Sequence, residues 1–383
     1  MDYNSILNSY TYQGVSDRYI NNDSIADFLD NLNLYFKVSV VGKSVENLDI
    51  KTVSWGVGST KVFMWSQMHG NESTTTKAVV DFLNLLNTCR EEWVKEWHSY
   101  FTFLIVPILN PDGAKYYTRV NANQVDLNRD SIALTQPESK ILRNIFDDFK
   151  PEYAFNLHDQ RTIFGVEDFE LPATISFLAP SYNEEREVNV NREEAMKLIA
   201  AINNELQLVI PNQVGRFDDS FNINCIGDYF QSRGAVTILF EAGHYQGDYK
   251  RDETRKIVFR SLLTVLKSIK EQSFSHYNVD NYFSIPNNAK SFNDVALLHV
   301  FMPDRSEEFI VNIQYLEQLK GKKVNFSPII VDINKKQSKF VHLSINKEFL
   351  FKKCWKDKDE VLDRNLEDIV EITAEEIDFL LKK

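Results

Sequence analysis

Short apolar runs alternate with longer amphipathic segments between residues 35 and 271. The run 101–109 is almost entirely apolar, as in a strand that is buried on both faces. Residues 73–98 and 252–271 instead repeat apolar side chains at helical spacing. This alternation predicts an α/β fold, a three-layer α/β/α sandwich around a central mixed, mostly parallel sheet.

Polar side chains follow four of the expected strands at the point where each strand ends. They are His69, Asn110, His158 and Glu241. Open α/β sheets gather their ligands at the carboxyl ends of their strands. We therefore expect these four widely separated residues to converge at one edge of the sheet.

A polar, loop-like stretch at residues 273–287 divides the chain. The 383 residues are more than one hydrophobic core usually serves. We expect a larger domain at residues 1–274 and a small C-terminal domain at residues 275–383. Four short apolar runs and a final helix indicate that the small domain is α+β or β-rich.

The charge and the apolar pattern exclude several classes of partner. The formal net charge of −12 argues against nucleic acid, and no run approaches the roughly 20 apolar residues of a membrane span. The N-terminus lacks the basic and apolar regions of a signal peptide, and the three cysteines form no disulfide framework. We expect a cytoplasmic protein with reduced thiols and no membrane partner.

His69 and Glu72 lie where an expected strand gives way to an expected helix. A histidine and a glutamate three positions apart at such a junction can turn an imidazole and a carboxylate toward one ion. Zinc hydrolases commonly hold their metal with three protein ligands and leave a fourth position for water. The pair therefore predicts a metal site that needs one more ligand and a base from elsewhere in the chain.

Within residues 55–270 the chain resembles the zinc carboxypeptidases of the M14 type. Its stretch 119–129 resembles bacterial, cytoplasmic members of that family most. The motifs occur in the order of that family. They are His69-x-x-Glu72, Asn110-Pro111-Asp112-Gly113, Arg119, Val125-Asp126-Leu127-Asn128-Arg129, His158 after an apolar strand, and Glu241 at the end of another.

The resemblance implies a role for each matching residue. His69, Glu72 and His158 would hold Zn2+, and Glu241 would be the general base and then the general acid. Arg119 would stabilise the oxyanion of the tetrahedral intermediate. Asn128 and Arg129 would grip the terminal carboxylate of a peptide or peptide-like substrate, since a guanidinium meets a carboxylate with two hydrogen bonds.

The chain departs from the digestive members of the family before Glu241. We find no equivalent of their substrate-covering tyrosine, because this region reads Phe217-Asp218-Asp219-Ser220-Phe221-Asn222. The segment 218–229 is expected to shape the side-chain pocket. Asp218 and Asp219 hint at a basic group on the substrate, although surface aspartates of a loop are the more common explanation.

Three functions are compatible with these motifs. The first is a metallocarboxypeptidase, a zinc-dependent hydrolase of a C-terminal peptide or peptide-like amide bond. The second is an N-acyl amino acid deacylase, because relatives with that activity share His-Gly-Asn-Glu and Asp-Leu-Asn-Arg. A murein-peptide amidase belongs with it, because the stretch 119–129 resembles bacterial members of the family, some of which cut murein peptides. The third is a non-catalytic, zinc-dependent module that binds carboxylate-ended ligands.

Overall fold

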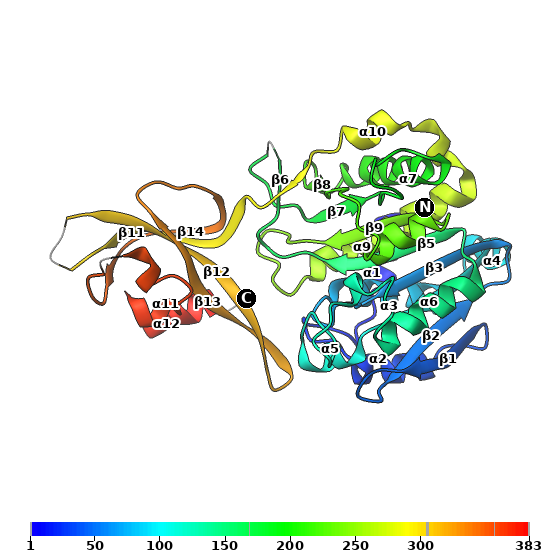
Figure 1. Ribbon diagram of the computed structural model, residues 1–383, viewed down its shortest axis with the longest axis horizontal. Helices are drawn as coiled ribbons and strands as arrows, with labels where there is room; N and C mark the ends of the chain where they lie inside the picture. The colour runs from blue at the N-terminus through cyan, green and yellow to red at the C-terminus, as the bar shows by residue number, and fades with distance from the viewer. Residues whose placement is uncertain (1, 168, 304–305, 356, 382–383) are drawn as a thin grey trace.

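The computed structural model of the chain describes residues 2–167, 169–303, 306–355 and 357–381. Its larger part is built around an eight-stranded sheet (Figure 1). In sheet order the strands are β1 (Phe36–Lys43), β2 (Asp49–Trp55), β4 (Phe101–Val106), β3 (Thr60–Ser66), β5 (Tyr153–Asp159), β9 (Val236–Ala242), β7 (Ile175–Leu178) and β8 (Val214–Arg216). The central strands β4, β3, β5 and β9 are parallel, and antiparallel neighbours flank them on both sides. The predicted mixed sheet is confirmed.

Helices cover both faces of this sheet, which gives the predicted three layers (Figure 1). Along β3, Val62 and Met64 belong to one hydrophobic cluster, and Phe63 and Trp65 belong to another. Successive side chains of a strand point to opposite faces, so an uninterrupted apolar run fills two cores at once. The main helices are α3 (Thr74–Thr88), α7 (Val190–Leu206) and α9 (Asp252–Glu271) on the first cluster, and α6 (Pro137–Phe149) and α8 (Ile226–Ser232) on the second.

The segment expected to form one helix at residues 73–98 forms two. These are α3 and α4 (Glu92–Tyr100), and the extended backbone of Cys89 separates them. The beginning of α3 is capped from a distance, because the carboxylate of Asp159 on β5 accepts hydrogen bonds from the amides of Thr74 and Thr75 at 2.8 and 3.2 Å. The first amides of a helix have no partner within the helix, and this carboxylate supplies one.

The C-terminal part of the chain forms a second sheet with its own hydrophobic cluster. This sheet lies to one side of the larger unit, with short helices against it (Figure 1). Its strands, in sheet order, are β13 (Lys323–Asn334), β12 (Glu308–Lys320), β11 (Phe292–Phe301), β14 (Phe340–Phe351) and β15 (Val370–Glu371), and its helices are α11 (Leu366–Ile369) and α12 (Ala374–Leu381). A small β-rich unit beside the sandwich is the predicted fold class.

The division of the chain between residues 274 and 275 stays a prediction. Tyr282, on α10 (Val279–Phe283), and Ile285 pack within the cluster of the larger unit. The C-terminal cluster takes its first strand residue at Val295. We propose that the boundary follows Ile285. Within the described residues, no helix is both long enough and apolar enough to cross a lipid bilayer.

A buried ion pair between α3 and α9 should be a main determinant of stability. Asp81 accepts a hydrogen bond from Arg255 Nε at 2.6 Å and another from the amide of Tyr12 at 2.7 Å. Asp81→Asn should lower the free energy of unfolding by about 3–5 kcal/mol, because it leaves a buried guanidinium without its counter-charge. Urea unfolding of the full chain measures the change.

The matched control for this prediction is Glu92→Gln. Glu92 forms an ion pair with Lys95 on the surface of α4, and water screens such a pair. The control should leave the unfolding midpoint unchanged. An Asp81→Asn protein as stable as the control would contradict the prediction.

Candidate metal centre

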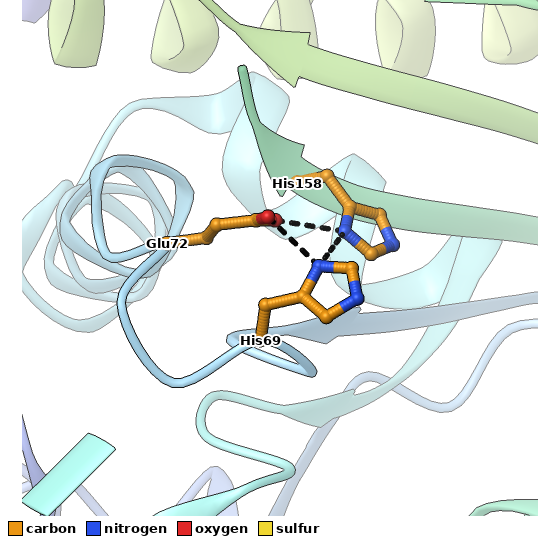
Figure 2. A group of neighbouring side chains, drawn as sticks. All are labelled: His69, Glu72 and His158. Carbon is orange, nitrogen blue, oxygen red and sulfur yellow. Dashed lines mark hydrogen bonds and ion pairs between the residues drawn. The ribbon is translucent and has the colours of Figure 1, made fainter. Parts of the chain in front are cut away.

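Three side chains from two distant segments of the chain converge on one point (Figure 2). His69 follows β3, Glu72 precedes α3, and His158 lies on β5. His69 Nδ1 lies 2.8 Å from one carboxylate oxygen of Glu72, and His158 Nδ1 lies 2.9 Å from the other. The two Nδ1 atoms are 3.1 Å apart. Both imidazoles are 2% exposed, so this cluster is buried.

The donor set fits a divalent metal ion. Two nitrogens bound to a tetrahedral zinc would lie roughly 3.3 Å apart, given Zn–N distances of about 2.0–2.1 Å. The observed separation of the two Nδ1 atoms is 3.1 Å. Two imidazoles with one carboxylate is also a usual set for catalytic zinc. The group can therefore hold a metal ion.

Close backbone packing holds the loop of His69 in place. A Cβ atom at Gly70 would lie 1.8 Å from the carbonyl carbon of Gly113, so this position has room only for glycine. Asn110 caps α5 (Pro111–Tyr116) by accepting from the amide of Gly113, and its Nδ2 donates to the carbonyl of Met68. Asn110, which was expected at the converging edge, therefore braces the loop.

Asp126 orients one of the imidazoles. Its Oδ1 lies 3.0 Å from His69 Nε2 and also accepts from the amide of Asn128 at 2.9 Å. A carboxylate on the outer nitrogen of a ligating histidine fixes the tautomer and the ring orientation. Arg119 links Asp126 to Glu72, since it donates hydrogen bonds to Asp126 Oδ2 and Glu72 Oε1, each at 3.1 Å.

The electrostatics keep the Glu72 carboxylate ionised. Burial alone would raise the pKa of Glu72, but His69 and His158 outweigh burial and hold this pKa well below its ordinary value. For His158, burial dominates and lowers the pKa, which favours the neutral imidazole. An ionised carboxylate and a neutral imidazole are the forms that bind a metal ion.

Glu241 lies beside His158 in the sheet. The two residues are register partners on the parallel strands β9 and β5, so their side chains leave the same face of the sheet. Burial, Glu72 and Asp159 together raise the pKa of Glu241 well above its ordinary value, against the effect of Arg119. A cation at the three-residue group would lower this pKa by direct attraction.

The seven residues to which the family resemblance gives a catalytic, substrate-binding or metal-binding role all line one cavity of about 590 Å³. They are His69, Glu72, Arg119, Asn128, Arg129, His158 and Glu241. Asn128 Oδ1 accepts from the amide of Ile226 at 2.9 Å, which ties this loop to the beginning of α8. Arg129 lies on the same 3-10 turn (Leu127–Arg129). The roles of these residues stay predictions.

The part of the cavity lining near Asn156, here called its branch, includes an aspartate that sequence reasoning passed over. Asn156, Leu239 and Leu178 form one row across β5, β9 and β7, two positions before His158 and Glu241. Gly227 packs near Asn156, and Asp228 follows it on α8. Asp228 is 6% exposed, and the described residues place no cation within ion-pair distance of it.

The aspartates that the sequence favoured have other partners. Asp219 pairs with Arg192 at 2.7 Å and Arg186 at 3.2 Å, and Asp218 is exposed and bonds to Ser220. Burial raises the pKa of Asp228 to about 7, whereas the pKa of Asp219 is lowered, with its arginines outweighing burial. The one sequence signal for Asp228 is its place within the segment 218–229 that was expected to shape the pocket.

Residues 18–177 match the sequence model of the zinc carboxypeptidase family, peptidase M14. Carboxypeptidase 2 of Trichophyton rubrum is 28% identical over 171 residues, which cover 43% of this chain and 29% of that protein. Carboxypeptidase 2 of Trichophyton tonsurans is 30% identical over 103 residues, which cover 26% of this chain and 19% of that protein. The matched segments thus span less than a third of these curated relatives.

Solved structures share the fold of the larger unit. A metallo-carboxypeptidase from Burkholderia cenocepacia aligns with a TM-score of 0.54 at 18% identity, over 66% of this chain and 70% of that chain. A metallo-carboxypeptidase from Pseudomonas aeruginosa, in complex with (2-guanidinoethylmercapto)succinic acid, aligns with a TM-score of 0.53 at 15% identity. This alignment covers 65% of this chain and 68% of that chain. The chain is thus similar in sequence to the M14 family of zinc carboxypeptidases over residues 18–177, and its larger unit has the fold of these metallo-carboxypeptidase structures.

Proposed function

We propose that this protein is a zinc-dependent hydrolase that removes the C-terminal residue of a peptide or peptide-like substrate. The observation that carries the proposal is the convergence of His69, Glu72 and His158 in a cavity that Glu241 also lines. The match of residues 18–177 to the zinc carboxypeptidase family supports zinc as the ion. When bound, zinc supplies Lewis acidity, which polarises a carbonyl and acidifies water.

Glu241 is the proposed proton carrier. Its carboxylate accepts a proton from the water molecule that adds to the scissile carbonyl. It then returns this proton to the leaving amine as the C–N bond breaks. The register of Glu241 with His158 supports this role, because it places the carboxylate beside the metal group on the same face of the sheet.

Two arginines have distinct proposed roles. Arg119 contacts Glu72 and is half exposed, so its guanidinium can donate to the oxyanion that develops next to the metal group. Arg129 lies farther along the same loop, and with Asn128 it is proposed to bind the terminal carboxylate of the substrate. Such an anchor would make the enzyme cut one residue from the end of a chain.

The branch of the cavity at Asp228 supports a preference for a cationic terminal side chain. Leu178 and Leu239 would contact an aliphatic stem, and the carboxyl of Asp228 would meet its charged end. Asn156 Oδ1, which is buried without a partner in the described residues, offers a second acceptor there. The ligand of the Pseudomonas aeruginosa relative, a succinic acid that carries a guanidino group, is compatible with this preference.

The deacylase and amidase alternatives use the same proposed groups and differ in the substrate. In the non-catalytic alternative, Glu241 would transfer no proton. The cytoplasmic location and the absence of nucleic-acid and membrane partners stay predictions.

Glu241→Gln should abolish turnover and leave one bound zinc ion per chain, because it removes the proton carrier and keeps all three ligands. We expect kcat to fall by about 10² to 10⁴, the usual contribution of a positioned acid or base. Peptides and N-acyl amino acids should be assayed side by side, with zinc content measured by elemental analysis. Glu185→Gln, at an exposed position, is the control.

Two outcomes of this assay would change the proposal. Activity of the wild-type protein on N-acyl amino acids alone would establish the deacylase. Equal turnover by the wild type and Glu241→Gln would exclude the assigned base.

Arg129→Ala should raise KM about 10-fold to 100-fold for peptides with a free C-terminal carboxylate, because it removes a charge-assisted hydrogen bond. The same substitution should change little for peptides that end in an amide. Steady-state kinetics on the two substrate series makes the measurement, and Arg233→Ala, at an exposed position, serves as control. Equal losses on both series would show that Arg129 does not contact the carboxylate.

Asp228→Asn should lower kcat/KM about 10-fold or more for peptides that end in lysine, and little for those that end in leucine. The carboxyl of Asp228 ionises near pH 7 in the free protein. The lysine-to-leucine ratio of kcat/KM should therefore rise from about pH 6 to about pH 8 in the wild type and stay flat in the variant. Asp218→Asn, which changes an exposed aspartate at the same cavity, is the matched control. An unchanged ratio in Asp228→Asn would rule out this assignment.

A further inference from the structure

One carboxylate of the C-terminal unit makes contact with residues that adjoin the metal centre. Glu317 lies near the tip of the β12–β13 hairpin, which approaches α5 (Figure 1). Its carboxylate accepts a hydrogen bond from Arg18 Nη2 at 2.9 Å and a short one from the phenol of Tyr117. Both donors are buried, so Glu317 is the acceptor for two groups that water does not reach well.

The first connection runs through Arg18. Burial disfavours its charge, but Glu317, Tyr117 and Asp159 outweigh burial and hold the pKa of Arg18 above its ordinary value. The backbone carbonyl of Arg18 accepts a hydrogen bond from Ser73 Oγ at 2.5 Å. Ser73 directly follows the ligand Glu72, so the position of Arg18 bears on this part of the metal group.

Arg18 also balances the charge of Asp159, the residue after His158. Burial raises the pKa of Asp159, and Arg18 and Arg251 oppose this rise. The carboxylate of Asp159 caps α3, and its own amide donates to Glu72 Oε2 at 3.1 Å. Asp159 therefore joins the His158 strand both to the beginning of α3 and to Glu72.

The second connection runs through Tyr117. This residue ends α5 in a left-handed conformation, with a φ of 57°. A tyrosine keeps such a conformation only where its surroundings hold it, and the hydrogen bond to Glu317 is one such restraint. Two residues farther on, Arg119 bonds to Glu72 and Asp126.

Other contacts besides those of Glu317 also join the two units. The short strands β6 (Gly165–Val166) and β10 (Asn288–Ala289) pair with each other. Asp294 also accepts from Thr162 Oγ1 at 3.2 Å and from the phenol of Tyr249 at 2.9 Å. The Arg18–Glu317–Tyr117 contact differs from these in that its two donors adjoin the metal centre.

We propose that Glu317 is a positioning residue through which the C-terminal unit completes the metal centre. By fixing Arg18 and Tyr117, it holds the segments that carry Glu72, His158 and Arg119 in their working arrangement. The inference rests on the proposed function for its kinetic readout. Its metal-binding readout is independent of any activity.

The test is Glu317→Gln in the full chain, which removes the charge and keeps the size of the side chain. We expect kcat for the best peptide substrate to fall about 10-fold, with KM little changed. The Kd for zinc should rise about 10-fold, which is the lower end of the usual effect of mutating residues that orient metal ligands. Glu348→Gln, at an exposed position on β14, is the matched control. Kinetics on zinc-saturated protein and titration against a chromogenic chelator make the two measurements.

A second variant keeps the test decisive if Glu317→Gln does not fold. Tyr117→Phe removes one hydrogen bond and should change the same two quantities in the same direction. If both single variants fold, their effects should not add, because both act on one contact. Circular dichroism and the melting temperature establish that each variant is folded under the assay conditions.

The outcomes separate this inference from the proposed function. Unchanged kcat and unchanged zinc affinity in a folded Glu317→Gln protein, even with a lower melting temperature, would overturn the inference and leave the proposed function intact. A wild-type protein that binds zinc but cleaves no peptide would overturn the proposed function, and zinc affinity alone would then decide the inference. A wild-type protein without zinc affinity would overturn both.

Discussion

The carboxylate of Glu72 is the group on which the arrangement of the site depends. It is buried, and it lies within hydrogen-bond distance of both Nδ1 atoms, Arg119 and the amide of Asp159. A buried carboxylate is costly unless positive charge and hydrogen-bond donors surround it. The chain meets this requirement by bringing together β3, β5, the beginning of α3 and the loop of Arg119. Binding of a divalent cation satisfies the same requirement, which explains why the group is built around this residue.

The sheet supplies the geometry for this convergence. Parallel strands end at one edge, so the residues that follow β3 and end β5 and β9 meet there without long loops. The register then orders the cavity along its length. His158 and Glu241 form one row, and Asn156, Leu239 and Leu178 form the row before it. The proposed reaction and the proposed side-chain pocket thus occupy neighbouring rows of the same face of the sheet.

Charge also links the two units of the chain. Arg18, Arg251, Asp159 and Glu317 form a group of two positive and two negative side chains beside the metal centre. Only Glu317 comes from the C-terminal sheet, so the charge balance next to the candidate metal site depends on docking of this sheet. The larger unit has its own complete hydrophobic core. Its group of charges beside the metal centre, in contrast, includes Glu317 from the C-terminal unit.

The sequence by itself determined the α/β sandwich and seven of the residues that line the cavity. Apolar runs filled two cores, and the polar residues after them had to lie at the sheet edge. Only the tertiary structure decided which aspartate lines the side-chain branch, since Asp219 finds two arginines and Asp228 finds none within ion-pair distance among the described residues. It alone revealed Glu317, whose partners Tyr117 and Arg18 lie 200 and 299 positions away in the sequence. Local spacing reflects which face of a strand or helix a residue occupies, whereas the pairing of buried charges depends on how distant segments pack together.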